Sequence, residues 1–94
     1  MENLQALTDF YETIADDVRI GVTHVCLYMA LLHEWNLSGL QRPFSVSRPG
    51  LMKKARISRR TYNKCMNELH QYGYIKYQPS SNPYIKSRVC LNRL

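Results

Sequence analysis

Apolar residues recur at helical spacing in two segments near the start of the chain. The first segment, residues 3–15, carries this repeat in Leu4, Leu7, Tyr11 and Ile14. Residues three or four apart share one face of a helix, so a short amphipathic helix is predicted, packed on the core or on a second subunit. In the second segment, from Val22 to Trp35, apolar residues occupy more than one side of the helix. We expect that helix to be buried from several directions, as the central helix of a domain or at a dimer contact.

Two further helices are predicted in the middle of the chain. Ser47 is a suitable N-cap for a short helix over residues 48–55, and Ser58 is a suitable N-cap for a longer one over residues 59–72. Gly73 follows directly and suits the left-handed position that ends many helices.

Alternation of apolar and polar residues predicts three strands. Residues 43–47 alternate over too few positions for more than a short edge strand. Alternation resumes over residues 74–78 and returns over 85–91, and the turn-forming residues 79–83 lie between them. The two later segments therefore predict a β-hairpin whose polar face is basic.

The order of these elements is helix, helix, short strand, short helix, tight turn, longer helix and hairpin. Only Arg56, Ile57 and Ser58 separate the third and fourth helices, which predicts a helix-turn-helix, although its turn lacks the usual glycine. We expect one domain over residues 1–94, mainly α with a small β-hairpin wing, in the winged helix-turn-helix order. Residues 1–16 would form the N-terminal helix, a candidate for dimerisation, and residues 44–91 the helix-turn-helix and wing.

Charge divides the chain sharply. Residues 1–41 hold one basic and six acidic side chains, a net charge of −5. Residues 42–94 hold twelve basic side chains and one acidic side chain, Glu68, a net charge of +11 within an overall +6. Such an asymmetry favours a polyanionic partner for the second part over a merely solvated basic face.

The wheel of the longer helix separates a core face from a polar face. Leu69 and the side chains near its direction are apolar or aromatic: Tyr62, Cys65, Met66 and Tyr72. The opposite side and the N-terminus carry groups that can hydrogen-bond base edges, and these are our candidates for base contact: Arg59, Arg60, Thr61, Asn63, Lys64, Asn67 and Gln71. Phosphate contacts are expected from Lys53, Lys54, Arg56 and the hydroxyl of Ser58.

The stretch from Phe44 to Leu91 resembles the winged helix-turn-helix superfamily. Its segment ISRRTYNKCMNELHQYGYIKY is similar to the recognition-helix-to-wing junction of bacterial regulators and phage replisome-organiser domains, with Leu69, Gly73 and Ile75 at the matching positions. The whole chain also resembles short proteins of Bacteroidetes genomes and their mobile elements. The resemblance implies that residues 59–71 enter the major groove of DNA and that the wing cations approach phosphates or the minor groove. Those cations are Lys76, Lys86 and Arg88.

Other chemistry finds little support. The three cysteines and three histidines show no zinc-ligand spacing, and the four glycines form no phosphate-binding loop. No metal, cofactor or catalytic constellation is expected, and the protein is not expected to be an enzyme. Apolar runs are too short for a membrane span and a basic signal-peptide start is lacking, so we expect a cytoplasmic protein with reduced thiols and no membrane partner.

The sequence thus predicts a homodimeric, sequence-specific binder of double-stranded DNA, most simply a transcriptional regulator. Two copies on a palindrome would double the base-contacting surface, and the first two helices would form the dimer contact. Alternatives are a replication-initiation or excision factor of a mobile element and a winged-helix protein-interaction module. A thiol redox sensor would need Cys26, Cys65 or Cys90 to be exposed and to have a depressed pKa.

Overall fold

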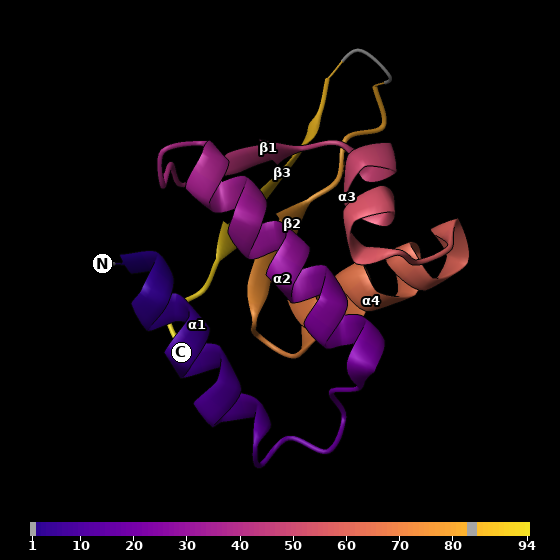
Figure 1. Ribbon diagram of the computed structural model, residues 1–94. Coiled ribbons are helices and arrows are strands. Elements are labelled where there is room, and N and C mark those ends of the chain that lie inside the picture. Colours follow the sequence, from indigo (N-terminus) through magenta and orange to yellow (C-terminus); the bar gives the residue numbers. More distant parts are fainter. Residues whose placement is uncertain (1, 83–84) are drawn as a thin grey trace.

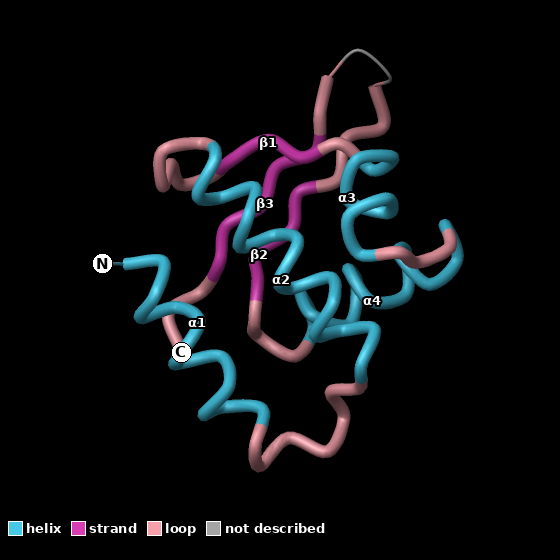
Figure 2. Tube along the Cα trace, viewed as in Figure 1, coloured by secondary structure: helices cyan, strands magenta, loops and turns pink. Residues whose placement is uncertain are grey.

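The computed structural model describes residues 2–82 and 85–94 and combines helices with one small antiparallel sheet (Figure 1). The helices are α1 (Glu2–Ile14), α2 (Val22–Leu37), α3 (Arg48–Ala55) and α4 (Arg59–Gln71), and the strands are β1 (Phe44–Val46), β2 (Ile75–Gln78) and β3 (Ser87–Leu91). Figure 2 shows α2 crossing the sheet, with α1 on one side and α3 and α4 on the other, and the hairpin of β2 and β3 extending beyond the helices. The predicted mainly α domain with a small β-hairpin is confirmed. Pro83, at the end of the predicted turn, lies outside the described residues.

The sheet has the order β1-β3-β2, so the last strand of the chain is the central one. Phe44 lies opposite Val89 in the pairing of β1 with β3, and Ile75 lies opposite Leu91 in the pairing of β2 with β3. These four apolar side chains are buried and form the inner face of the sheet. The predicted returning strand is shorter than expected, because it begins at Ser87, whereas Ile85 is 59% exposed near the hairpin tip.

Helix α2 is the central helix and lies across the inner face of the sheet (Figure 1). Leu27, Tyr28, Leu31 and Trp35 on this helix are fully buried. The helix also packs against α3 and α4. The prediction of a helix buried from several directions is confirmed, and the described contacts place it at the centre of the domain.

Helix α1 is attached to this core chiefly through Phe10. The Phe10 ring stacks on Tyr28, with ring centroids 3.8 Å apart and planes 5° apart, and meets the edge of Tyr74 at 5.7 Å. Leu4 and Tyr11, on another face of α1, are about half exposed, at 55% and 51%. The first of the two predicted alternatives, packing of this helix on the core, is therefore confirmed.

The turn between α3 and α4 is made without glycine. Arg56 adopts a left-handed conformation with φ 56° and ψ 48°, and the N–H of Ile57 donates to the carbonyl of Met52 at 3.1 Å. A side chain in this conformation costs about 1–2 kcal/mol, because Cβ approaches the following carbonyl. Both predicted N-caps are confirmed: Ser47 accepts from the N–H of Gly50 and Ser58 from that of Thr61.

Candidate nucleic-acid interface

Helix α4 has one apolar and one polar face, as its wheel predicts. Tyr62, Cys65, Met66 and Leu69 are buried, and Tyr72, just after the helix, is half-buried. The predicted outward residues are all exposed: Arg59, Arg60, Asn63, Lys64, Asn67 and Gln71. Thr61 is half-buried. The structure therefore presents these candidate base-contacting groups on one continuous exposed face.

The one acidic residue of α4, Glu68, is held away from this face. His24 of α2 contacts its Oε1 with Nε2 at 3.0 Å, and the hydroxyl of Tyr72 donates to its Oε2 at 3.1 Å. Burial by itself would raise the pKa of Glu68, but the hydrogen bonds from His24 and Tyr72 outweigh burial and leave this pKa below its usual value. The Glu68 carboxylate is therefore held by His24 and Tyr72 and is not part of the outward face.

The start of α4 uses its hydroxyl groups internally. Ser58 Oγ accepts the N–H of Thr61 at 3.2 Å and donates to Thr61 Oγ1 at 3.1 Å. A phosphate contact from the Ser58 hydroxyl, as the sequence predicts, would replace one of these bonds. Arg59 beside it is exposed and forms no ion pair within residues 2–82 and 85–94.

A groove of about 710 Å³ lies between the start of α3, the start of α4 and the hairpin tip. Three exposed cations line it: Arg48, Arg59 and Lys86. The hydroxyl-bearing residues Ser47, Ser80 and Ser87 line it too. A concave surface with several cations and small donors suits a phosphodiester backbone, because charge-assisted hydrogen bonds to phosphate are stronger than neutral ones.

Arg48 is the one cation of the groove that was not predicted from the sequence. It occupies the first helical position of α3, where the helix dipole disfavours a cation. A basic residue at that unfavourable position was a signal of a role other than helix stability. Arg59 and Lys86 were predicted, and the structure brings them together in one groove.

The remaining wing cations lie elsewhere. Lys76 and Arg88 line a separate hollow of about 240 Å³ together with Arg42 and Cys90. Lys76 lies opposite Cys90 in the sheet, and Arg88 lies opposite Gln78. Since their neighbours Ile75 and Val89 face the core, these two cations project from the outer face of the sheet.

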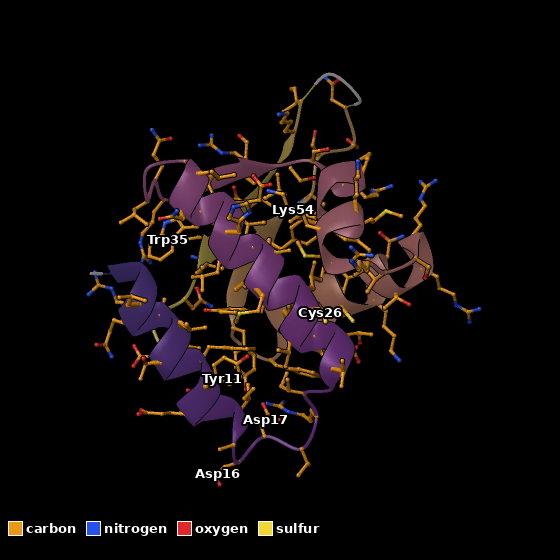
Figure 3. The ribbon with its side chains drawn as sticks, in the orientation of Figure 1. Tyr11, Asp16, Asp17, Cys26, Trp35 and Lys54 are labelled. Carbon is orange, nitrogen blue, oxygen red and sulfur yellow. The ribbon has the colours of Figure 1, made fainter. Side chains whose placement is uncertain are left out.

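The three cations at the end of α3 differ from one another. Lys53 and Arg56 are exposed. Lys54 forms an ion pair with Glu34, and its Nζ lies 3.0 Å from His33 Nδ1, which holds it at the α2–α3 junction (Figure 3). The amino group of Lys54 is therefore bound by residues of α2, whereas the amino group of Lys53 and the guanidinium of Arg56 are exposed to solvent.

Three potential metal ligands meet between α2 and α4, although their spacing in the sequence shows no zinc pattern. Donor atoms of His24, Cys65 and Glu68 lie within 4.8 Å of one another. The N–H of Gly21 donates to His24 Nδ1 at 3.0 Å, so the ring proton is on Nε2 and is donated to Glu68. Binding a metal through Nε2 would move that proton to Nδ1, where it would oppose the Gly21 N–H. The cluster fits a satisfied hydrogen-bond network better than a metal centre.

The loop between α1 and α2 is fastened to the end of α4 by Asp17. This carboxylate accepts hydrogen bonds from the Arg19 guanidinium at 2.8 Å and from the Tyr74 hydroxyl at 2.7 Å. These bonds, first from Arg19 and then from Tyr74, hold the pKa of Asp17 far below its usual range. The Arg19 guanidinium also lies 4.1 Å from the centre of the Tyr72 ring. No pattern in the sequence indicates this contact, because Asp17 and Tyr74 are 57 positions apart.

The comparisons with known proteins identify no relative. The chain has no significant match to a protein-family model, a curated protein sequence or a solved structure. Among the described residues, no helix is both long enough and apolar enough to cross a membrane. The structure alone defines a small domain of four helices and a three-stranded antiparallel sheet over residues 2–82 and 85–94.

Proposed function

We propose that this chain is a winged-helix domain that binds double-stranded DNA sequence-specifically, with α4 in the major groove. The observation that carries the proposal is the continuity of two surfaces at Arg59. This residue belongs to the exposed polar face of α4 and also lines the cationic groove beside the hairpin. One strand of a duplex lying in that groove would bring its bases to the side chains of α4.

The chemistry of α4 suits base recognition. Asn63, Asn67 and Gln71 can each make paired hydrogen bonds to adenine, and Arg60 or Lys64 can do so to guanine. The groove supplies the contacts that carry no sequence information, because Arg48, Arg59 and Lys86 would neutralise phosphates. Base contacts and phosphate contacts thus come from separate residues, which makes the two roles separable by mutation.

The experiment is selection of bound sequences from random duplexes, followed by affinity measurements over a series of salt concentrations. Asn63→Ala should weaken the selected site by about 1–3 kcal/mol relative to random DNA and leave the salt dependence unchanged. The triple change Arg48→Gln, Arg59→Gln and Lys86→Gln should weaken all duplexes and reduce the slope of log affinity against log salt by about 2–3.

The double change Lys76→Gln and Arg88→Gln is the matched control, because both cations lie on the outer face of the sheet. It removes two charges where the triple change removes three, so the two changes of slope are compared per charge removed, and that of the double change should be the smaller. No duplex binding at low salt would overturn the proposal, and so would a triple variant with an unaltered slope. A protein partner captured after nuclease treatment by wild type, but not by the triple variant, would favour an interaction module instead.

We propose that the domain acts as a homodimer and as a transcriptional regulator. Exposed side chains on one side of α2 support a dimer contact: Val22, Cys26, His33 and Leu37. Val22 is 79% exposed and Leu37 63%, and they are the first and last residues of this helix. Leu37→Glu should convert a dimer to a monomer in analytical ultracentrifugation, while Asn63→Ala should not. A wild-type chain that is monomeric at all concentrations, with and without its selected DNA, would refute this part.

A further inference from the structure

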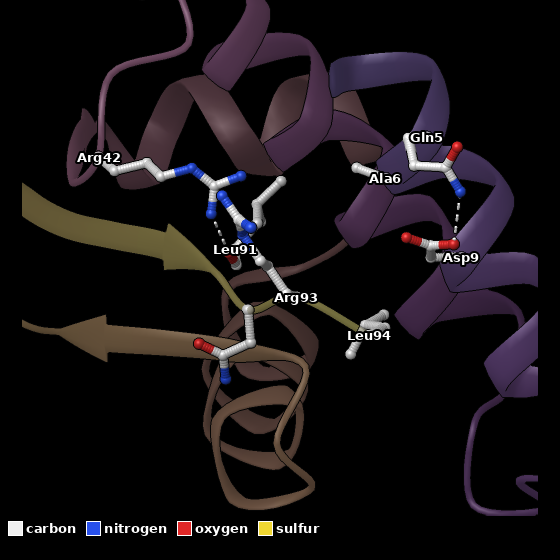
Figure 4. A pocket seen from close by; sticks show the side chains of 8 residues that line it. Gln5, Ala6, Asp9, Arg42, Leu91, Arg93 and Leu94 are labelled. Atoms are coloured by element: carbon white, nitrogen blue, oxygen red, sulfur yellow. Dashed lines mark hydrogen bonds between the residues drawn. The ribbon is translucent and has the colours of Figure 1, made fainter. Parts of the chain in front are cut away.

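A third hollow lies away from the cationic groove, between α1 and the segment that follows β3 (Figure 4). Its volume is about 260 Å³. Gln5, Ala6 and Asp9 of α1 line one side of it, and Arg42, Leu91 and Arg93 lie on the other. None of these residues is needed for the proposed DNA contact.

The guanidinium of Arg42 is held in a fixed position in this cavity. Its NH1 donates to the carbonyl oxygen of Leu91 at 3.0 Å, and its central carbon lies 4.7 Å from the centre of the Trp35 ring. A guanidinium has five N–H donors, so the bond to Leu91 leaves others available. A cation immobilised in this way loses little conformational entropy when it binds a carboxylate.

Asp9 supplies the opposite charge. Its Oδ1 accepts a hydrogen bond from Gln5 Nε2 at 2.8 Å, which orients the carboxylate and leaves Oδ2 available. Within the described part of the chain, Asp9 forms no ion pair with Arg42 or Arg93, although all three line the same cavity. Opposite charges that share a cavity without contact leave room for a ligand that contacts both.

A polar group of the core that does not itself line the cavity is unpaired. The hydroxyl of Tyr28 is buried and has no hydrogen-bond partner among the described residues. Burial raises the pKa of Tyr28 to about 12, and the charges of Arg42 and Asp9 act on it in opposite directions. Tyr28 therefore lies within electrostatic reach of both sides of the cavity.

We infer that this cavity binds a small zwitterion of the α-amino-acid class, with its carboxylate on Arg42 and its ammonium group on Asp9. Arg93 provides a second cation near the carboxylate. Ala6 and Leu91 contact the side chain of the ligand, so an uncharged side chain is favoured. The volume is below the range of roughly 300–1,000 Å³ that drug-sized ligands occupy, which restricts the occupant to a small metabolite.

The single tryptophan provides the measurement. Because Arg42 lies over the ring of Trp35, a ligand on Arg42 should change Trp35 fluorescence in a saturable way. The free protein is titrated with each proteinogenic L-amino acid and, for those that bind, with a matched carboxylate lacking the amino group and a matched amine lacking the carboxylate. At least one amino acid should bind, and each singly charged analogue should bind about tenfold or more weakly.

Asp9→Asn and Arg93→Gln test the two sides of the cavity without disturbing the contact of Arg42 with Trp35. Each should weaken amino-acid binding about tenfold, while Lys64→Gln on α4 should leave it unchanged. No fluorescence change with any amino acid, equal binding of the matched carboxylate, or full binding by Asp9→Asn would overturn the inference. The titration contains no DNA, so its result is independent of the proposed DNA binding.

Discussion

The attachment of α1 to the core is the feature that mutation can test most sharply. Phe10 is fully buried, stacks on Tyr28 and meets the edge of Tyr74. Replacing a buried phenylalanine by alanine removes its apolar contacts and leaves a cavity, which together cost about 3–5 kcal/mol. The aromatic contacts account for about 0.5–1.5 kcal/mol each within that cost.

The expected loss is large relative to the whole stability of the domain. A chain of 94 residues has a free energy of unfolding of about 5–15 kcal/mol, so Phe10→Ala should remove a substantial share of it. Phe10→Leu retains much of the volume and should cost about 1–2 kcal/mol, since it loses the ring contacts.

Urea unfolding followed by circular dichroism and by Trp35 fluorescence measures both changes. Tyr11→Ala is the matched control, because Tyr11 is the next residue of the same helix and is 51% exposed. That change should cost less than about 1 kcal/mol. If Phe10→Ala cost no more than Tyr11→Ala, α1 would not be held by Phe10, and the packing described for this helix would be wrong.

Two other predictions concern the turn and the loop. Arg56→Gly should relieve the left-handed conformation of the turn between α3 and α4 and raise the free energy of unfolding by roughly 0.5–1 kcal/mol, because the greater entropy of unfolded glycine offsets part of the gain. Arg56→Lys, which keeps the charge and the strain, should not; a glycine variant no more stable than wild type would contradict the reasoning. Asp17→Asn should destabilise the protein above about pH 5, where the low folded-state pKa of Asp17 makes its full contribution. The difference from wild type should shrink as the pH falls below about 4, because Asp17 is then protonated in the unfolded chain while it is still ionised in the folded one, and it should vanish only when the folded state is protonated as well. The exposed neighbour change Asp16→Asn should have little effect at any pH. Unfolding curves at a series of pH values measure this, and a difference that grew on acidification would reverse the assigned sign.

Local patterns predicted the elements well because local physics decides them. Ser47 and Ser58 cap their helices as expected. Gly73, just after α4, adopts the predicted left-handed conformation with a φ of +88°. The core face of α4 could be predicted from helical periodicity alone, because Tyr62 and Leu69 share the apolar side of the helical wheel.

Contacts between distant residues could not be predicted in this way. Glu68 and His24 are 44 positions apart, and Tyr74 and Asp17 are 57 apart. Nothing in the local pattern of either pair indicates its partner. The ion pair of Lys54 with Glu34 could not be predicted either, because it depends on the packing of α3 against α2.

Lys86 and Arg88 were expected to act together, but they lie on different surfaces because a strand begins later than predicted. Lys86 and Arg88 are two positions apart, so strict alternation would place both on one face. Strand β3 begins at Ser87, so Lys86 lies outside the strand. It lines the cationic groove instead. A boundary displaced by a residue or two was enough to separate two side chains that alternation groups together.

The position of α1 has a consequence for how the molecule would approach a polyanion. Five of the seven acidic residues lie on α1 or in the loop after it, whereas α3, α4 and the hairpin carry most of the cations. Figure 1 shows α1 on one side of the molecule and α3 and α4 on the other. The domain is therefore an electric dipole as well as a net cation. In the field of a duplex, the resulting torque should turn the α4 side forward before contact, so that salt slows productive encounter as well as weakening the final complex.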